Sequence, residues 1–140
     1  MPKKQDWRPK RPHRKGGEGP PVWREFVDAY LEAALWSSFD ELGDPLDDRF
    51  TVQDFAQEAV DKAVEDSNAF IEANRGDLDA TGASDSQHGH DFWLTRNHHG
   101  VGFWDRGYAG DVGQRWTEEA HAFGEVNAYV GDDGLVYFMP

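Results

Sequence analysis

The sequence of 140 residues contains no cysteine, and this absence excludes several kinds of chemistry at once. A chain without cysteine has no disulfide framework, no thiol nucleophile and no cysteine-ligated zinc or iron–sulfur centre. The sequence also lacks an apolar run approaching the roughly 18 residues of a spanning helix. No apolar stretch follows the basic N-terminus, so we expect no secretory signal, no membrane association and a cytoplasmic location.

The motifs of the common enzyme classes are absent as well. The chain has no Walker A loop, no dinucleotide fingerprint, no Gly-x-Ser-x-Gly and no His-Glu-x-x-His. Carboxylates are plentiful, but the pattern singles out no pair with opposed environments. These absences lean against an enzyme without deciding the matter, and the sequence predicts no catalytic residue and no cofactor.

Charge is abundant and unevenly distributed. The chain holds 27 Asp and Glu against 14 Lys and Arg, a formal net charge of −13. Residues 1–15 hold seven cations and one acid, a net charge of +6, whereas residues 16–140 hold seven cations and 26 acids, a net charge of −19. Prolines and glycines interrupt the basic segment, so we predict a disordered tail over residues 1–20 and a single acidic domain over 21–140.

Three interpretations of the basic tail remain open. Basic arms often bind nucleic acid through the phosphates, which makes nucleic acid a candidate partner of this segment. Alternatively, the tail only keeps the protein in solution, or it folds back on the acidic body. The cations have no regular spacing, and this favours the two simpler interpretations.

Apolar residues at steps of three and four predict three helices. The first covers about residues 22–36. The second covers about 52–75, with Thr51 as N-cap, Asp54 as its capping-box partner and Gly76 as the end. The third begins after Asp111 and ends at Gly124. Residues 76–90 are polar and rich in glycine, which predicts a loop.

Two further segments have the composition of β-hairpins. The β-prone runs 91–96 and 101–105 flank residues 97–100, and the runs 126–130 and 135–138 flank Gly-Asp-Asp-Gly at 131–134. The expected fold class is therefore α+β: two N-terminal helices, then a β-hairpin, a helix and a second β-hairpin. We expect a mainly antiparallel four-stranded sheet packed on the helices.

Residues 90–106 read HDFWLTRNHHGVGFWDR, and this segment resembles a family of small, uncharacterised bacteriophage and prophage proteins. Residues 123–124 and 129–134 resemble the continuation of the same family, so the resemblance covers about residues 88–138. It implies a phage or prophage origin and expression inside a bacterial host cell, and it implies no activity. The family has Asn-Gly-His-Gly at the turn, whereas this chain has His98 in place of the first glycine, which argues against a tight turn of that type.

An acidic row follows the second predicted helix. Steps of three and four, with Asn68 between the last two acids, align Asp54, Glu58, Asp61, Glu65 and Glu72 opposite the apolar face. Like charges at this spacing destabilise an isolated helix by about 0.2–0.5 kcal/mol per pair. We therefore hypothesise a phage-type accessory protein that imitates nucleic acid and inhibits a host nucleic-acid-binding or defence protein with a basic surface. The simpler interpretation is an ordinary solvated acidic face.

The alternative function is a nucleic-acid or small-ligand (nucleotide) binding domain that uses the basic tail and the hairpin at 91–106. Arginine binds phosphate in a bidentate manner and tryptophan stacks on bases, although tryptophan on a short sheet is more often core. The candidate ligand-binding residues are Trp93, Arg96, His98, His99, Trp104 and Arg106. Histidines also bind zinc, nickel or copper, but a hairpin would hold its entrance and its tip roughly 20 Å apart, so no metal site is predicted.

Overall fold

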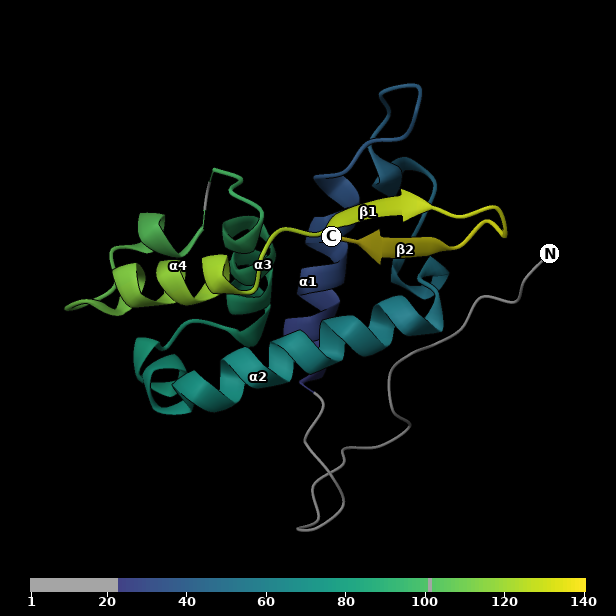
Figure 1. Ribbon diagram of the computed structural model, residues 1–140. Helices are drawn as coiled ribbons and strands as arrows, with labels where there is room; N and C mark the ends of the chain where they lie inside the picture. The colour runs from purple at the N-terminus through teal and green to yellow at the C-terminus, as the bar shows by residue number, and fades with distance from the viewer. Residues whose placement is uncertain (1–22, 101) are drawn as a thin grey trace, which may run out of the picture.

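The computed structural model describes residues 23–100 and 102–140, so the predicted tail lies outside the described residues (Figure 1). Within this range the chain forms four α-helices and one β-hairpin. Their bounds are α1 Arg24–Trp36, α2 Gln57–Thr81, α3 Asp85–Arg96, α4 Val112–Ala122, β1 Asn127–Val130 and β2 Val136–Met139. Short 3-10 turns cover Leu46–Asp48, Val52–Asp54 and Phe103–Arg106. No helix in these two ranges is long and apolar enough to cross a membrane.

Helices α1 and α3 pack side by side at the centre of the molecule (Figure 1). The two helices come very close at Gly89, where an added Cβ atom would lie 1.9 Å from the carbonyl oxygen of Phe26. Only glycine allows two helix backbones to come this close. In Figure 1 the long helix α2 runs beneath this pair, α4 lies beyond α3 and the hairpin lies beside α1.

A single buried cluster of aromatic side chains joins these elements. The ring of Phe70 in α2 lies at its centre, 4.7 Å from Phe92 of α3 and 5.3 Å from Phe103, measured between ring centroids. Trp116 of α4 packs edge-on against the same ring. Val136 brings β2 into the same cluster. Because the cluster draws on all four helices and on β2, the described elements share one hydrophobic core.

The hairpin predicted at 91–105 is wrong, and with it the four-stranded sheet. Residues 91–96 belong to α3, and the only sheet among the described residues has two antiparallel strands, β1 and β2. Helix α3 begins inside the predicted loop because the Ser84 hydroxyl accepts a hydrogen bond from the backbone N–H of Gln87 at 3.1 Å. Nearly every residue from His88 to Arg96 is buried, so the sequence of α3 lacks the alternation of apolar and polar faces that predicts a helix.

The second helix also begins and ends later than predicted. Thr51 and Asp54 do form a capping box, but it caps a 3-10 turn, and α2 begins only at Gln57. Gly76 lies inside α2, which continues to Thr81 and ends at Gly82, whose φ is 71°. An exposed glycine costs a helix only about 1 kcal/mol, so tertiary packing carries α2 past this position. The predicted first and third helices and the C-terminal hairpin are confirmed.

Candidate binding surfaces

The acidic row predicted on α2 is only partly a surface. Glu58, Asp61, Glu65 and Glu72 are exposed on the outer side of the helix. Asp54 is 4% exposed, precedes α2 and accepts a hydrogen bond from the backbone N–H of Thr51 at 2.7 Å. Asp54 therefore has a local structural role, and the exposed row consists of the other four residues.

The exposed acids differ in what neutralises them. Glu72 forms an ion pair with Arg75, one turn further along α2. Asp61 accepts a hydrogen bond from the Gln57 side chain at 2.8 Å. Within the described ranges, the ion pairs include neither Glu58, Asp61 nor Glu65. The N-terminal half of α2 consequently presents three carboxylates without a cationic partner from this part of the chain.

The cations of residues 23–140 are largely taken up by this chain's own acids. This segment has seven Lys and Arg against 25 Asp and Glu. Six of those seven cations lie in ion pairs, which are Arg49–Asp40, Lys62–Asp66, Arg75–Glu72, Arg96–Asp66, Arg106–Asp91 and Arg115–Asp77. Few of the remaining acids can therefore be neutralised from within this segment, and its surface has a strong negative potential.

Two of the residues predicted to bind a ligand lie in the core instead. Trp93 is 1% exposed, and its indole N–H donates to the Ser37 hydroxyl at 2.8 Å. Arg96 is also 1% exposed. Neither side chain can stack on a base or bind a phosphate without unfolding part of the molecule, so the predicted ligand set does not assemble.

Arg96 is the centre of a buried polar network. Its guanidinium donates to the Tyr30 hydroxyl at 3.0 Å and to the Asp66 carboxylate at 2.8 Å. It also donates to the backbone carbonyls of Phe123 and Gly124, at 3.0 and 2.9 Å. Burial raises the pKa of the Tyr30 phenol to about 12, although the positive charge of Arg96 acts in the opposite direction. The network links α1, α2 and α3 to the end of α4.

Arg106 has a similar role nearer the surface. Its guanidinium holds the buried Asp91 carboxylate through two hydrogen bonds of 2.8 and 2.9 Å, which raise the pKa of the Arg106 side chain. This pair joins the 3-10 turn Phe103–Arg106 to α3. Such a bidentate Arg–Asp contact is a strong structural link. It occupies the donors with which Arg106 was predicted to bind a phosphate.

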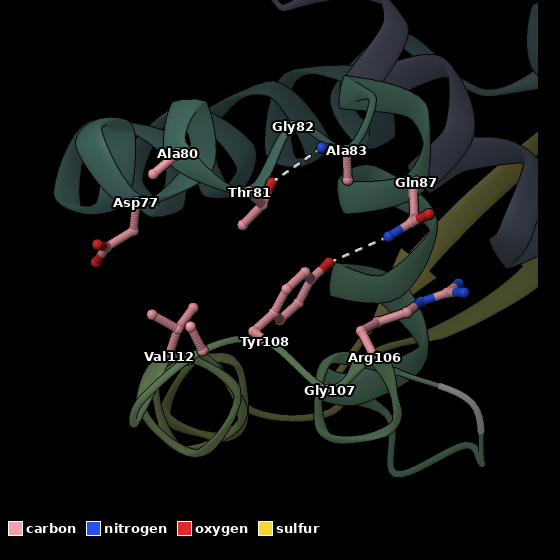
Figure 2. Close-up of a pocket in the computed structure, with 11 residues that line it drawn as sticks. Asp77, Ala80, Thr81, Gly82, Ala83, Gln87, Arg106, Gly107, Tyr108 and Val112 are labelled. Atoms are coloured by element: carbon pink, nitrogen blue, oxygen red, sulfur yellow. Dashed lines mark hydrogen bonds between the residues drawn. The ribbon is translucent and has the colours of Figure 1, made fainter.

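Arg106 also lines a hollow of about 640 Å³ (Figure 2). The figure shows its guanidinium turned away from the hollow, while Tyr108 accepts a hydrogen bond from the Gln87 side chain at 3.1 Å. Thr81 faces the hollow from the end of α2, and its hydroxyl lies 3.0 Å from Nε2 of the buried His88. Burial lowers the pKa of His88, so this imidazole favours its neutral form. The side chains that line this hollow do not form a recognisable catalytic arrangement.

The other three predicted ligand residues gather around a smaller hollow. His98, His99 and Trp104 line a space of about 280 Å³ together with His121 of α4. The imidazoles of His98 and His121 stack with their centroids 4.1 Å apart, and Trp104 is 66% exposed. Across residues 23–100 and 102–140, no three His, Asp or Glu side chains are placed to hold a metal ion.

A groove of about 550 Å³, which was not predicted from the sequence, lies between the loop after α1 and strand β1. Phe39 and Leu42 lie on its loop side with 61% and 87% of their surface exposed, and Tyr129 lies on its strand side. The sequence contains one hint of it. Leu42 stands directly before the Gly-Asp-Pro turn at 43–45 and Phe39 three residues earlier, in a segment where polar residues are usual.

Comparison with known proteins identifies no relative of this chain. No family model, no curated protein and no solved structure matches this chain. The resemblance of residues 88–138 to phage proteins therefore stays a prediction.

Proposed function

We propose that this chain acts by binding, and that the exposed acidic row of α2 contacts the basic surface of a nucleic-acid-binding protein in a bacterial host cell. The observation that supports this proposal is the pairing of cations with acids. Six of the seven cations in residues 23–140 lie in ion pairs within the chain, and Glu58, Asp61 and Glu65 are in none of these pairs. A complementary basic surface on a partner would neutralise these acids.

The spacing of the row favours a partner that normally binds nucleic acid. Glu58, Asp61 and Glu65 follow one another at about 5 Å along the helix axis, from a rise of 1.5 Å per residue. A single strand of DNA places one negative charge about every 3.4 Å along its axis. A groove built to bind phosphates would thus meet carboxylates at a comparable density. The attraction would fall as salt rises, because the screening length is only about 8 Å at physiological ionic strength.

The test is a capture experiment with two matched charge-reversal variants. The full-length protein is immobilised and exposed to bacterial lysate at low and at high salt, and bound proteins are then eluted with duplex DNA. One variant combines Glu58→Lys, Asp61→Lys and Glu65→Lys. The control combines Glu118→Lys, Glu125→Lys and Asp132→Lys, which changes the net charge equally at other exposed positions.

We expect the wild type and the control to retain a nucleic-acid-binding protein that DNA displaces, and the α2 variant to lose it. If the α2 variant captures the same protein as the wild type, the row is only a solvated face. Equal loss in both variants would mean that net charge attracts the partner and that α2 has no particular role.

A further inference from the structure

The imidazoles of His98 and His121 form a pair that no local pattern in the sequence reveals. His98 follows α3, whereas His121 lies in the last turn of α4. Their rings stack with centroids 4.1 Å apart and an angle of 24° between the ring planes. The distance across a hairpin, which argued against a metal site, does not apply here because residues 91–96 are helical.

Backbone hydrogen bonds fix the position of His98. Its N–H donates to the Thr95 carbonyl at 3.1 Å, and the N–H of His99 donates to the Leu94 carbonyl at 2.8 Å. His98 has a φ of 57°, and it is the one residue other than glycine with a positive φ in the described ranges. This left-handed turn ends α3 in a way that is common at helix C-termini, and it brings the imidazole of His98 against α4.

Helix α4 holds His121 in place. Trp116 and Ala120 of this helix are fully buried in the core. His121 comes directly after Ala120 and is exposed. Both imidazoles are therefore carried by backbone that is already in position, so binding a ligand between the two rings costs little conformational entropy.

The ring nitrogens of this pair are available to a ligand. The imidazole hydrogen bonds within residues 23–100 and 102–140 belong to His88 and His90, and His98 and His121 take part in none of them. Both residues of the pair are exposed. The unprotonated nitrogen of a neutral imidazole is a good ligand for zinc, copper and nickel ions. The pair therefore has the chemistry of a metal chelate.

The hollow around the pair favours a cation over an anion. The described residues that line it include Asp105 and no Lys or Arg. Residues 23–140 as a whole have seven Lys and Arg against 25 Asp and Glu. Such a field draws cations to the surface and repels phosphates and carboxylates. A positively charged occupant therefore fits this place better than an anionic one.

We propose that His98 and His121 together bind one Zn²⁺ ion, and that water completes its coordination. Zinc accepts imidazole nitrogen readily, and zinc sites with water in an open position are common in proteins. The bound ion would join the segment after α3 to the end of α4. This inference concerns these two elements alone and does not rest on the proposed role of α2.

The stacked rings need only a small movement to bind the ion. Zinc–nitrogen bonds of about 2.0–2.1 Å at a tetrahedral angle place two imidazole centroids about 5 Å apart. The separation of 4.1 Å must therefore grow by about 1 Å. Neither ring has a hydrogen bond within the described residues that this movement would break, and both residues are exposed.

Zinc titration of the full-length protein tests this site. Isothermal titration calorimetry measures the dissociation constant in the presence of excess Mg²⁺, which prefers oxygen ligands and occupies weak carboxylate sites. The variants are His98→Gln and His121→Gln, each of which removes one imidazole. The matched control is His99→Gln, because His99 is exposed and lines the same hollow.

We expect the wild type and His99→Gln to bind one zinc ion with the same affinity, and His98→Gln and His121→Gln each to weaken binding at least about tenfold. No zinc binding by the wild type would overturn the proposal. Equal affinity in the wild type and the two pair variants would also overturn it, because zinc would then bind elsewhere on the acidic chain. A comparable loss in His99→Gln would replace the pair with a site of three histidines.

Thermal unfolding provides a second readout, because an ion that binds only the folded chain raises its melting temperature. Excess zinc should raise the melting temperatures of the wild type and His99→Gln and leave those of His98→Gln and His121→Gln unchanged. Sedimentation of the same samples reports the oligomeric state, which zinc should not alter. Dimers that form only with zinc would overturn the proposal in favour of an ion shared between two copies.

Discussion

The inner and outer sides of α2 both carry acidic residues, but the inner acid is buried in ion pairs and the outer acids are exposed to solvent. Glu65 and Asp66 are neighbours in the sequence, yet Glu65 is exposed, whereas Asp66 is 4% exposed. Asp66 contacts Lys62 through one oxygen and Arg96 through the other, at 3.1 and 2.8 Å. An acidic side chain is thus available to a partner only where the chain's own cations do not reach it.

Replacing the buried Asp66 should lower the free energy of unfolding more than any other substitution considered below. Asp66→Ala leaves Arg96 buried without its counter-ion, and breaking a buried pair in this way costs about 3–5 kcal/mol. Glu65→Ala removes a carboxylate that lies in solvent and should change the free energy of unfolding by less than about 0.5 kcal/mol. Urea denaturation of both variants measures the difference. Similar midpoints for the two would mean that the Arg96 network contributes little.

The second prediction concerns alkaline pH. Burial raises the pKa of Tyr30 to about 12, compared with 10.0 for a tyrosine in water. Between these values the unfolded chain releases the proton and the folded chain keeps it, so stability is complete below pH 10 and falls as pH rises towards 12. Two pKa units correspond to about 3 kcal/mol. Tyr30→Phe should remove much of this fall when urea midpoints are compared from pH 9 to 12.

Tyr137 provides the exposed control for this measurement. Its hydroxyl donates to Asp133 in the hairpin turn, which raises the pKa of Tyr137 to about 12 as well. Solvent screens this pair, so Tyr137→Phe should alter the alkaline fall less than Tyr30→Phe. A larger effect at Tyr137 would reverse the expected order of the inner and outer sites.

Two glycine substitutions compare a packed position with an exposed one without changing any charge. Gly89→Ala places a methyl group against the backbone of Phe26 and must push α1 and α3 apart, a form of overpacking that typically costs about 1–3 kcal/mol. Gly76→Ala has open space around the new methyl group and should stabilise α2 by about 0.5–1 kcal/mol. Thermal unfolding should therefore shift in opposite directions for the two variants. A rise in both melting temperatures would contradict the close contact at Gly89.

The smallest effect is expected on the acidic row itself. Asp61 stands three residues from Glu58 and four from Glu65, so Asp61→Asn removes two like-charge contacts worth about 0.2–0.5 kcal/mol each. The variant should be slightly more stable than the wild type at low salt, and the gain should vanish at high salt. Urea denaturation midpoints of the variant and the wild type at two salt concentrations measure this gain. A loss of stability would show that the Gln57–Asp61 hydrogen bond outweighs the repulsion.

Patterns within a few residues were enough to predict some elements. The apolar stripes of α1 and α4 face one core, and the Gly-Asp-Asp-Gly turn at 131–134 connects two β-prone runs, so both helices and the C-terminal hairpin follow from their own sequence. The exposed part of the α2 row followed in the same way. Helical periodicity places Glu58, Asp61 and Glu65 on the side opposite the apolar face.

Segment 85–96 could not be predicted in this way. Its aromatic residues favour a strand, and strand propensity mainly reflects how side chains pack on a half-buried surface. In the folded chain α3 is buried on most sides, so packing against α1 and α4 outweighs the local preference. The candidate ligand residues do not come together for the same reason. Helix α3 places Trp93 and Arg96 in the core, whereas His98 and Trp104, which follow the helix, are exposed.

Composition and local patterns were enough to separate a basic segment from an acidic body, to exclude thiol chemistry, and to predict two of the helices and the C-terminal hairpin. Which charges face outward depends on contacts that form only in the folded chain. Arg96 reaches Tyr30 and Asp66 across 66 and 30 residues of sequence, and no local pattern contains those contacts. A charge is stable inside a protein only when such distant partners surround it, so its place depends on the whole fold.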